Sequence, residues 1–425
     1  MATTQSSSRD PSTMPYAPVT ETDLAALQVD GLSPHYVASP GTEAAVAEAL
    51  ASADAQGWPV LTRCGGTKMA LGNPPRAATA WLDLRGLGGI VDYTPADLTV
   101  TVLAGTPLAA LQQALAEHGQ MVALDPPLTA GASIGGILAT GDSGPRRLAY
   151  GTARDLVIGM RVATPDGRLT RSGGKVVKNV TGYDLHKLHI GGLGTLGVIV
   201  EVSFKLHPIP RQVRTVVAGF ADCAGGMQAV LRLLRSPLDP LSMVQVSDAE
   251  GWTLLVEHAG APAALARKID DTARYCREAG AGSVEVQDAP SRDHWLPLWT
   301  ADTEPGARIK VSLRPTLVAD YCLALQADAA EAGVAAGCAL FAGNGIVYAR
   351  LGGGSAEALA TLVGALRSRA ETLGGSLVLQ QAPLEVKRLV DVWGRAPGGL
   401  SLMRTLKQTY DPRGILNSGR YVGGI

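Results

Sequence analysis

The sequence is poor in charge, cysteine and histidine, and each shortage excludes a class of site. Charged residues make up 18% and the net charge is −1, so the chain lacks the basic surface that nucleic-acid binding requires. The five cysteines contain no C-x-x-C pair and the seven histidines no His-x-His spacing, so no zinc or iron–sulfur site is predicted. No apolar run reaches the roughly 18 residues of a membrane span, and no signal peptide opens the chain. We therefore expect a reduced, cytoplasmic setting.

Glycine and proline, in contrast, are abundant. The 51 glycines and 26 prolines indicate a loop-rich enzyme rather than a helical bundle. Apolar residues make up 46%, enough for sizeable cores, and 425 residues are enough for two or three domains of about 150 residues each.

The most informative stretch is residues 191–206, which contains a GxGxxG motif from Gly192 to Gly197. A Rossmann dinucleotide site needs a strand before this motif and a helix after it. Here the order is reversed, because residues 181–189 resemble a short helix and residues 198–206 alternate as a strand does. The motif therefore predicts a glycine turn that feeds a strand, not a Rossmann fold.

Two further glycine segments lie upstream. Residues 64–68 (CGGTK) follow a short strand at 59–63, and successive N–H groups in such a turn form an anion-binding nest. The second segment runs from Asp125-Pro126-Pro127 to the ASIGG motif at residues 132–136. A Tyr-Gly…Arg-Asp motif at 150–155 then leads into a hairpin that turns at Pro165-Asp166-Gly167.

In this order the motifs resemble the FAD-binding domain of the vanillyl-alcohol oxidase / p-cresol methylhydroxylase superfamily, over roughly residues 26–208. Residues 173–185 narrow the resemblance to the FAD-binding E subunits of bacterial glycolate oxidases, and residues 411–417 extend it weakly. The implied fold is α+β: a two-subdomain FAD-binding domain of the PCMH type, followed by an α/β cap domain with a mainly antiparallel sheet. We expect a disordered tail at 1–25, the FAD-binding domain at 26–208, the cap at 209–403 and a segment at 404–425 that packs back on the FAD-binding domain.

Local patterns predict individual elements. Helices are expected at 41–57, 262–278, 317–332 and 356–373, and a further one is expected to follow a Thr106 cap and to end before Gly119. Strands are expected at 80–84, 90–93 and 98–103 in the first domain. In the second they are expected at 213–220, 243–246, 252–257, 283–287, 310–313, 346–351 and 376–380, with the helices on one face.

The resemblance implies an FAD site built from the glycine segments. It assigns to the cofactor Arg63, Cys64, Gly65, Gly66, Thr67, Lys68, Pro126, Ser133, Ile134, Gly135, Gly136, Gly141, Asp142, Lys178, Tyr183, Gly197, Val198 and Ile199. Some relatives attach FAD through a histidine in the first glycine turn, where this chain has Thr67, so noncovalent binding is expected. Lys175 or Lys178 is a candidate for stabilising negative charge on the reduced flavin.

The cap lacks the groups that catalytic relatives carry. Their His-Ala-Gly-Asp-Gly-Asn-Leu-His segment supplies imidazoles for a metal or a proton, whereas this chain has FAGNGIVY at residues 341–348. Phe341 can neither ligate a metal nor accept a proton. Remaining candidates for handling a proton are Tyr348, His294 and Tyr183, and Lys310 and Arg314 are candidates for binding a carboxylate.

The resemblance therefore implies a noncovalent FAD subunit of a multi-subunit 2-hydroxy-acid oxidase, with glycolate as the first candidate substrate. A paralogous FAD subunit would remove the hydride, an iron–sulfur subunit would complete the complex, and this chain would relay electrons. The complex could reach the inner face of the cytoplasmic membrane through its partners. Two alternatives remain open: a self-sufficient FAD oxidoreductase of a 2-hydroxy acid, and a scaffold subunit without a cofactor.

Overall fold

The computed structural model describes residues 15–20, 27–128, 130–175, 182–247, 251–292, 295–296 and 306–425. Lys178 and His294 lie outside these residues, as do residues 1–14 and 21–25 of the expected tail. Within that expected tail, however, Ala17 and Pro18 form a strand that pairs with Tyr36 and Val37. None of the described helices is both long and apolar enough to cross a membrane.

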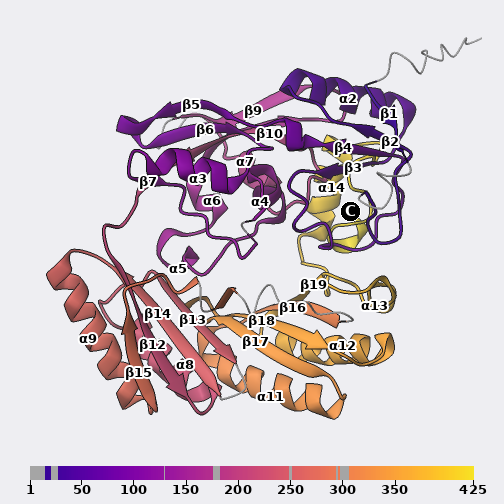
Figure 1. The fold of residues 1–425 in the computed structure, drawn as a ribbon. Coiled ribbons are helices and arrows are strands. Elements are labelled where there is room, and N and C mark those ends of the chain that lie inside the picture. Colours follow the sequence, from indigo (N-terminus) through magenta and orange to yellow (C-terminus); the bar gives the residue numbers. More distant parts are fainter. Residues whose placement is uncertain are drawn as a thin grey trace, which may run out of the picture.

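The described part of the N-terminal region, residues 15–208, contains a four-stranded sheet, a five-stranded sheet and a two-stranded pair (Figure 1). A four-stranded sheet has the order β1-β2-β4-β3, is parallel at its β2-β4 and β4-β3 pairs, and is covered by helix α2. Its elements are β1 (Ala17–Pro18), β2 (Tyr36–Ala38), α2 (Glu43–Gln56), β3 (Val60–Arg63) and β4 (Ala80–Asp83). Helix α2 begins where the Thr42 side chain accepts from the Ala45 N–H and ends at Gly57, whose φ of 64° suits glycine.

The second sheet of this region is antiparallel, with the order β5-β6-β10-β8-β9. Its strands are β5 (Ile90–Thr94), β6 (Thr99–Leu103), β8 (Val157–Ala163), β9 (Leu169–Gly173) and β10 (Val198–Lys205). Short helices lie below it, and the longest ones join its apolar core (Figure 1). These are α3 (Leu108–Ala116), α4 (Ile134–Thr140), α5 (Arg147–Tyr150), α6 (Ala153–Leu156) and α7 (His186–His189), with β7 (Gln120–Met121) paired to β11 (His207–Pro208) nearby.

Among the described residues after 208, eight strands form one antiparallel sheet, which we call the cap sheet. Its order is β15 (Ser283–Gln287), β12 (Val213–Phe220), β14 (Trp252–Ala259), β13 (Ser242–Ser247), β17 (Ala335–Phe341), β18 (Ile346–Gly352), β16 (Gly306–Ser312) and β19 (Ser376–Gln381). Helices α8 (Cys223–Leu234), α9 (Pro262–Glu278), α11 (Val318–Glu331) and α12 (Ala356–Thr372) cover one face, and the other face is turned towards the N-terminal region (Figure 1). Val216, Ala218 and Phe220 of β12 enter the core beneath the helices, as the period of two in a strand requires.

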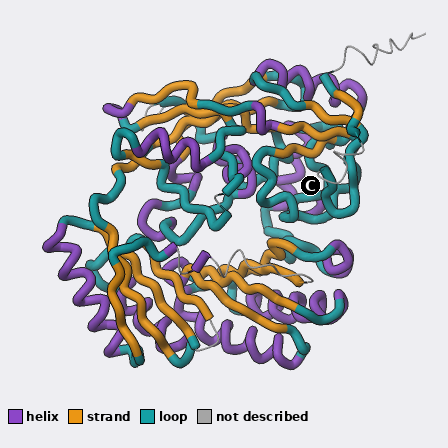
Figure 2. Tube along the Cα trace, in the orientation of Figure 1, coloured by secondary structure: helices purple, strands orange, loops and turns teal. Residues whose placement is uncertain are grey.

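The chain then returns to the N-terminal region through α13 (Leu384–Leu389) and α14 (Leu400–Tyr410) (Figure 2). Helix α14 spans the expected boundary at 404. Leu416 forms a parallel bridge with Val60, and the Asn417 N–H donates to the Val60 carbonyl. The end of the chain is thereby joined to the strand that precedes the first glycine turn.

The expected α+β class and the mainly antiparallel cap sheet are confirmed, and the structure differs from the local expectations at four points. Pro107, not Thr106, is the N-cap of α3, because the Thr106 hydroxyl donates to the Leu103 carbonyl instead. The ASIGG glycines lie inside helix α4, which was not predicted. Strand β17 and helix α8 were not predicted at all.

Candidate functional site

A cavity of about 820 Å³, open to solvent on one side, joins the three glycine segments. Eleven of the residues assigned to FAD line it: Arg63, Cys64, Gly66, Thr67, Lys68, Ser133, Gly135, Gly136, Asp142, Val198 and Ile199. Residues that are far apart along the chain therefore line one continuous cavity.

The first glycine loop follows β3 and turns at Gly66, whose φ is 80°. A Cβ atom at Gly65 would lie 1.9 Å from the Gly131 carbonyl oxygen, so no other residue fits there. The Gly65 N–H donates to the Ser133 hydroxyl at 2.8 Å, whereas the N–H groups of Gly66 and Thr67 donate to no described residue. Two unused backbone donors at a cavity wall are what a diphosphate requires, so the loop fits FAD.

Helix α4 forms the second wall. The Gly135 N–H donates to the Ala104 carbonyl at 2.7 Å, and a Cβ atom at Gly135 would lie 2.9 Å from that of Ala104 and 3.1 Å from Cys64 Sγ. This glycine thus lets α4 pack closely against the end of β6 and the first loop. Burial raises the pKa of the Cys64 thiol to about 12, so Cys64 is not a nucleophile.

The third wall is the turn before β10. Gly191 and Gly194 have φ values of 81° and 68°, and Leu193 lies between them with a φ of 50°. Leu193, Gly194, Val198 and Ile199 line the cavity. As predicted, a helix (α7) precedes this turn and a strand (β10) follows it, so the Rossmann order is absent.

The other described residues assigned to FAD do not line this cavity. Gly65, Ile134 and Gly197 lie behind the wall, and a Cβ atom at Gly197 would lie 2.6 Å from Val162 Cγ1. Gly141 ends helix α4 with a φ of 63°, and Pro126 is buried and accepts a hydrogen bond from Arg292. Tyr183 is 88% exposed, and Lys175 pairs with Asp92 at 2.8 Å, so neither points into the cavity.

Sequence reasoning missed two residues of the C-terminal segment that line the cavity, Asn417 and Arg420. The Asn417 side chain accepts from the Thr62 N–H and donates to the Thr62 hydroxyl at 3.0 Å. The Arg420 guanidinium donates to the carbonyls of Met69 and Leu71. The only signal in the sequence was the weak resemblance at 411–417, which stops short of Arg420.

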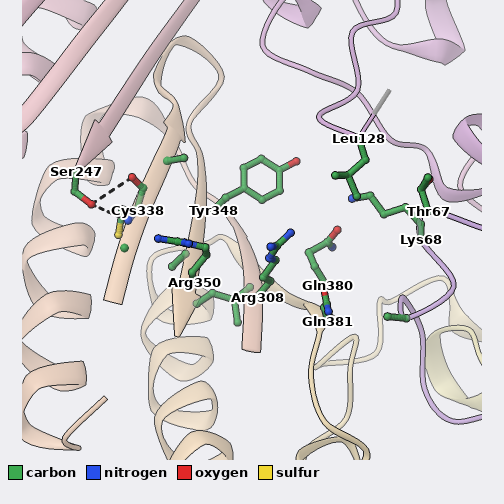
Figure 3. A pocket seen from close by; sticks show the side chains of 15 residues that line it. Thr67, Lys68, Leu128, Ser247, Arg308, Cys338, Tyr348, Arg350, Gln380 and Gln381 are labelled. Carbon is green, nitrogen blue, oxygen red and sulfur yellow. Dashed lines mark hydrogen bonds between the residues drawn. The ribbon is translucent and has the colours of Figure 1, made fainter. Parts of the chain in front are cut away.

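A second cavity, of about 650 Å³, shares Thr67 and Lys68 with the first and reaches the cap sheet (Figure 3). Arg308 on β16 and Arg350 on β18 are direct cross-strand partners, and both line it. No carboxylate is among the described residues that line it. Like charges placed opposite each other destabilise a sheet, so this pair suits a site for an anion.

The segment expected to carry the chemistry is apolar. Phe341 is fully buried and packs edge-on against Trp295 and Tyr348, with ring centroids 5.8 and 5.0 Å away. Burial raises the pKa of Tyr348 far above its usual value of about 10, so its hydroxyl stays protonated. Asn344 lies in the turn between the two strands, in a 3₁₀ helix (Ala342–Asn344).

Lys310 is the one carboxylate-binding candidate that faces the site. It lies opposite Tyr348 in the sheet, with Nζ 5.9 Å from the ring centroid, and lines a pocket beside Lys68 and Asp142. Burial, together with the neighbouring Arg147, lowers the pKa of Lys310 to about 8. Asp142 forms an ion pair with Lys68 at 3.4 Å, whereas Arg314 is exposed.

Known proteins with similar sequences bind FAD. Residues 34–173 match the FAD binding domain family, and residues 392–421 match the C-terminal domain of FAD linked oxidases. The chain is 44% identical over 154 residues to the glycolate oxidase subunit GlcE of Escherichia coli, which covers 36% of this chain and 43% of that one. It is 30% identical to the mitochondrial D-2-hydroxyglutarate dehydrogenase of Bos taurus, over 95% of this chain and 84% of that one. In fold it resembles p-cresol methylhydroxylase, with a TM-score of 0.75 and 17% identity over 95% and 93% of the two chains.

Proposed function

The chain belongs to the family of FAD-linked oxidases and is an FAD-dependent oxidoreductase, and we propose from this premise that it is the FAD-binding subunit of a multi-subunit 2-hydroxy-acid oxidase. Glycolate is the first candidate substrate of the complex, because the similarity to a glycolate oxidase subunit reaches 44% in the region of the glycine segments. The dehydrogenase relative supports the same class of substrate, an acid with a hydroxyl group beside the carboxylate.

We assign FAD to the cavity between the glycine segments. The N–H groups of Gly66 and Thr67 would hold the diphosphate, and the backbone of Val198 and Ile199 would lie along the flavin or adenine edge. Binding would be noncovalent, because the threonine at position 67 has no nucleophile comparable to the imidazole of covalently linked relatives. FAD, when bound, accepts a hydride from carbon and passes the electrons on.

The cavity beside Arg308 and Arg350 is the place we propose for an anionic acid. Arg350 forms no ion pair or hydrogen bond with another described residue, and its guanidinium lies beside Gly337 and Cys338, which line the cavity with it (Figure 3). A carboxylate there would gain charge-assisted hydrogen bonds. Gln380, which also lines the cavity, would donate a further hydrogen bond.

The observation that carries the subunit assignment is the apolar packing of Phe341 against Trp295 and Tyr348. Oxidation of a hydroxy acid requires removal of the hydroxyl proton, and a general base contributes about 10²–10⁴ in rate. Phenylalanine provides no lone pair, and a tyrosine that stays protonated accepts no proton. We therefore propose that this chain relays electrons for a paralogous FAD subunit, with an iron–sulfur subunit as the third partner, on the cytoplasmic side of the membrane.

A self-sufficient oxidoreductase is the second candidate, and Lys310 is the observation that favours it. With a pKa of about 8, a fraction of Lys310 is neutral at physiological pH and can accept a proton. Its position beside Tyr348 and between the two cavities would bring it near both flavin and acid.

Co-purification of the tagged chain, followed by an absorbance spectrum and denaturation, tests the proposal. We expect flavin bands, release of FAD into the supernatant, and co-purification of a second flavoprotein and of a subunit with iron–sulfur absorbance. A colourless chain that cannot be reconstituted would favour the scaffold alternative. Flavin that stays with the precipitated protein would overturn noncovalent binding, and a yellow chain with no partners would favour the second candidate.

A further inference from the structure

The loop that carries the two unused N–H groups is held from behind by two buried cations. The carbonyls of Met69 and Leu71 accept from Arg420 Nη2, at 2.5 and 2.6 Å. The carbonyl between them, that of Ala70, accepts from Lys387 Nζ at 2.7 Å. Three successive carbonyl groups of one turn therefore point at cations rather than at the cavity.

These cations come from parts of the chain that are remote from the loop. Lys387 lies on α13, where its side chain is fully buried, and Arg420 lies near the C-terminus and is 5% exposed. Arg420 is itself fixed, because its own carbonyl accepts from the Asn73 N–H and from the Trp393 indole.

The charges beneath the loop do not balance. Lys387 pairs with Asp30 at 2.8 Å, and no described carboxylate forms an ion pair with Arg420. Arg420 Nε, which is buried, bonds to no described atom, and Arg420 lines the cavity. A buried charge without a counterion is unfavourable, so the arrangement suits a ligand that brings negative charge.

We propose that Arg420 and Lys387 are positioning residues for FAD, which hold the carbonyls of Met69, Ala70 and Leu71 so that the N–H groups of Gly66 and Thr67 remain available to the diphosphate. The inference rests on the placement of the diphosphate at the first glycine loop. Both residues act through the loop, and Arg420 also contributes a positive charge behind it. Their effect is therefore specific to a flavin that carries phosphate.

The test compares FAD with riboflavin, which has the same ring but no diphosphate. We expect Arg420→Met to raise the FAD dissociation constant about 10- to 100-fold, the size of the loss of hydrogen bonds from a charged group, and to leave riboflavin binding unchanged. Arg420→Lys should restore part of the affinity, and Lys387→Met should act in the same direction as Arg420→Met. The matched control is Arg413→Met in the same segment, whose side chain contacts Asp54 on the surface.

Unchanged FAD affinity in both methionine variants would overturn the inference. Equal losses for FAD and riboflavin, together with a lower melting temperature of the apoprotein, would also overturn it, since they indicate a structural role only. If Arg420→Met does not fold, the FAD and riboflavin affinities of Arg420→Lys and Lys387→Met test the inference in its place. Gly66→Val separates the placement of the diphosphate from the role of the two cations. If Gly66→Val loses FAD while the methionine variants bind it normally, the diphosphate lies at the loop but the cations do not position it. If Gly66→Val binds FAD unchanged, the diphosphate does not lie at this loop.

Discussion

The first glycine loop and the hairpin from Phe341 to Tyr348 both reach the second cavity, through Thr67 and Lys68 on one side and Tyr348 on the other, yet they are built in opposite ways. The loop leaves the N–H groups of Gly66 and Thr67 unused and turns its carbonyls to buried cations. The hairpin fills its position with aromatic rings. Polar groups left ready for a ligand on one side, and an apolar core on the other, suit a chain that holds a cofactor at the loop and offers no base at the hairpin.

The largest expected effect is loss of FAD when a side chain is introduced at a glycine of the cofactor cavity. Gly65→Val should reduce bound FAD from near one per chain to near none, because its Cβ would collide with the Gly131 carbonyl. Gly135→Val should do the same, since α4 could no longer pack against Ala104. Absorbance of the purified chains measures the FAD content, with Gly282→Val as control because a Cβ there meets nothing within 4 Å. Yellow variants would show that these glycines do not shape the site.

Arg350→Gln should affect the second cavity, where we place the acid, rather than the FAD site. It should weaken binding of a 2-hydroxy acid to the FAD-loaded chain about tenfold, through loss of a charge-assisted hydrogen bond, while FAD content stays the same. Titration of the flavin difference spectrum with glycolate and with D-lactate gives the dissociation constants. The exposed Arg314 supplies the control substitution, Arg314→Gln. If Arg350→Gln and Arg314→Gln weaken binding equally, the acid does not bind in this cavity.

The pH dependence of acid binding should report Lys310. Because its pKa is about 8, Lys310 carries its charge below pH 8 and loses it above, so affinity for the carboxylate should fall several-fold between pH 7 and pH 9. Lys310→Met should bind more weakly at pH 7 and show a flat profile over the same range. A profile that is unchanged in the variant would assign the titration to another group.

The last prediction concerns Asp125, at the contact between the N-terminal region and the cap sheet. Burial raises its pKa to about 7, although its backbone partner Arg146 opposes the shift. Its protonation therefore stabilises the fold at low pH, and this contribution is lost as the pH rises through about 7. Relative to Asp125→Asn, the wild-type free energy of unfolding should fall by about 1–3 kcal/mol between pH 5 and pH 8. Urea titrations at both pH values measure it, with Asp97→Asn as an exposed control.

Local signals in the sequence predicted much of the fold. Glycine turns and β-branched runs located β3 and β10, and the strand that replaces the helix after Gly197 excluded a Rossmann fold. Helix α8 was missed because Gly225 and Gly226 weaken its helical pattern, although Asp222 caps it. Strand β17 was missed because its Ala-Ala-Gly start has low strand propensity.

The lining of the cavity was predictable in part from the glycine pattern, which pointed to Gly66 and Gly135 but also to Gly65, Gly141 and Gly197, which do not line it. It was not predictable where a side chain acts over a long separation, as Arg420 does on Met69 across 351 residues. Nor does a lone arginine such as Arg350 reveal from the sequence that Arg308 lies opposite it. Such pairs depend on strand register and on where the chain end returns, which local patterns do not encode.

Anaerobic single-turnover reduction of the isolated, FAD-loaded chain tests the central claim most directly. Excess glycolate or D-lactate is added, and the flavin absorbance is followed with and without the partner subunits. We expect no bleaching over minutes from the chain alone, because the segment from Phe341 to Tyr348 supplies no base, and bleaching once the paralogous flavoprotein is present. Bleaching within seconds by the isolated chain would contradict the account and identify a self-sufficient enzyme, with Lys310 as the first residue to substitute.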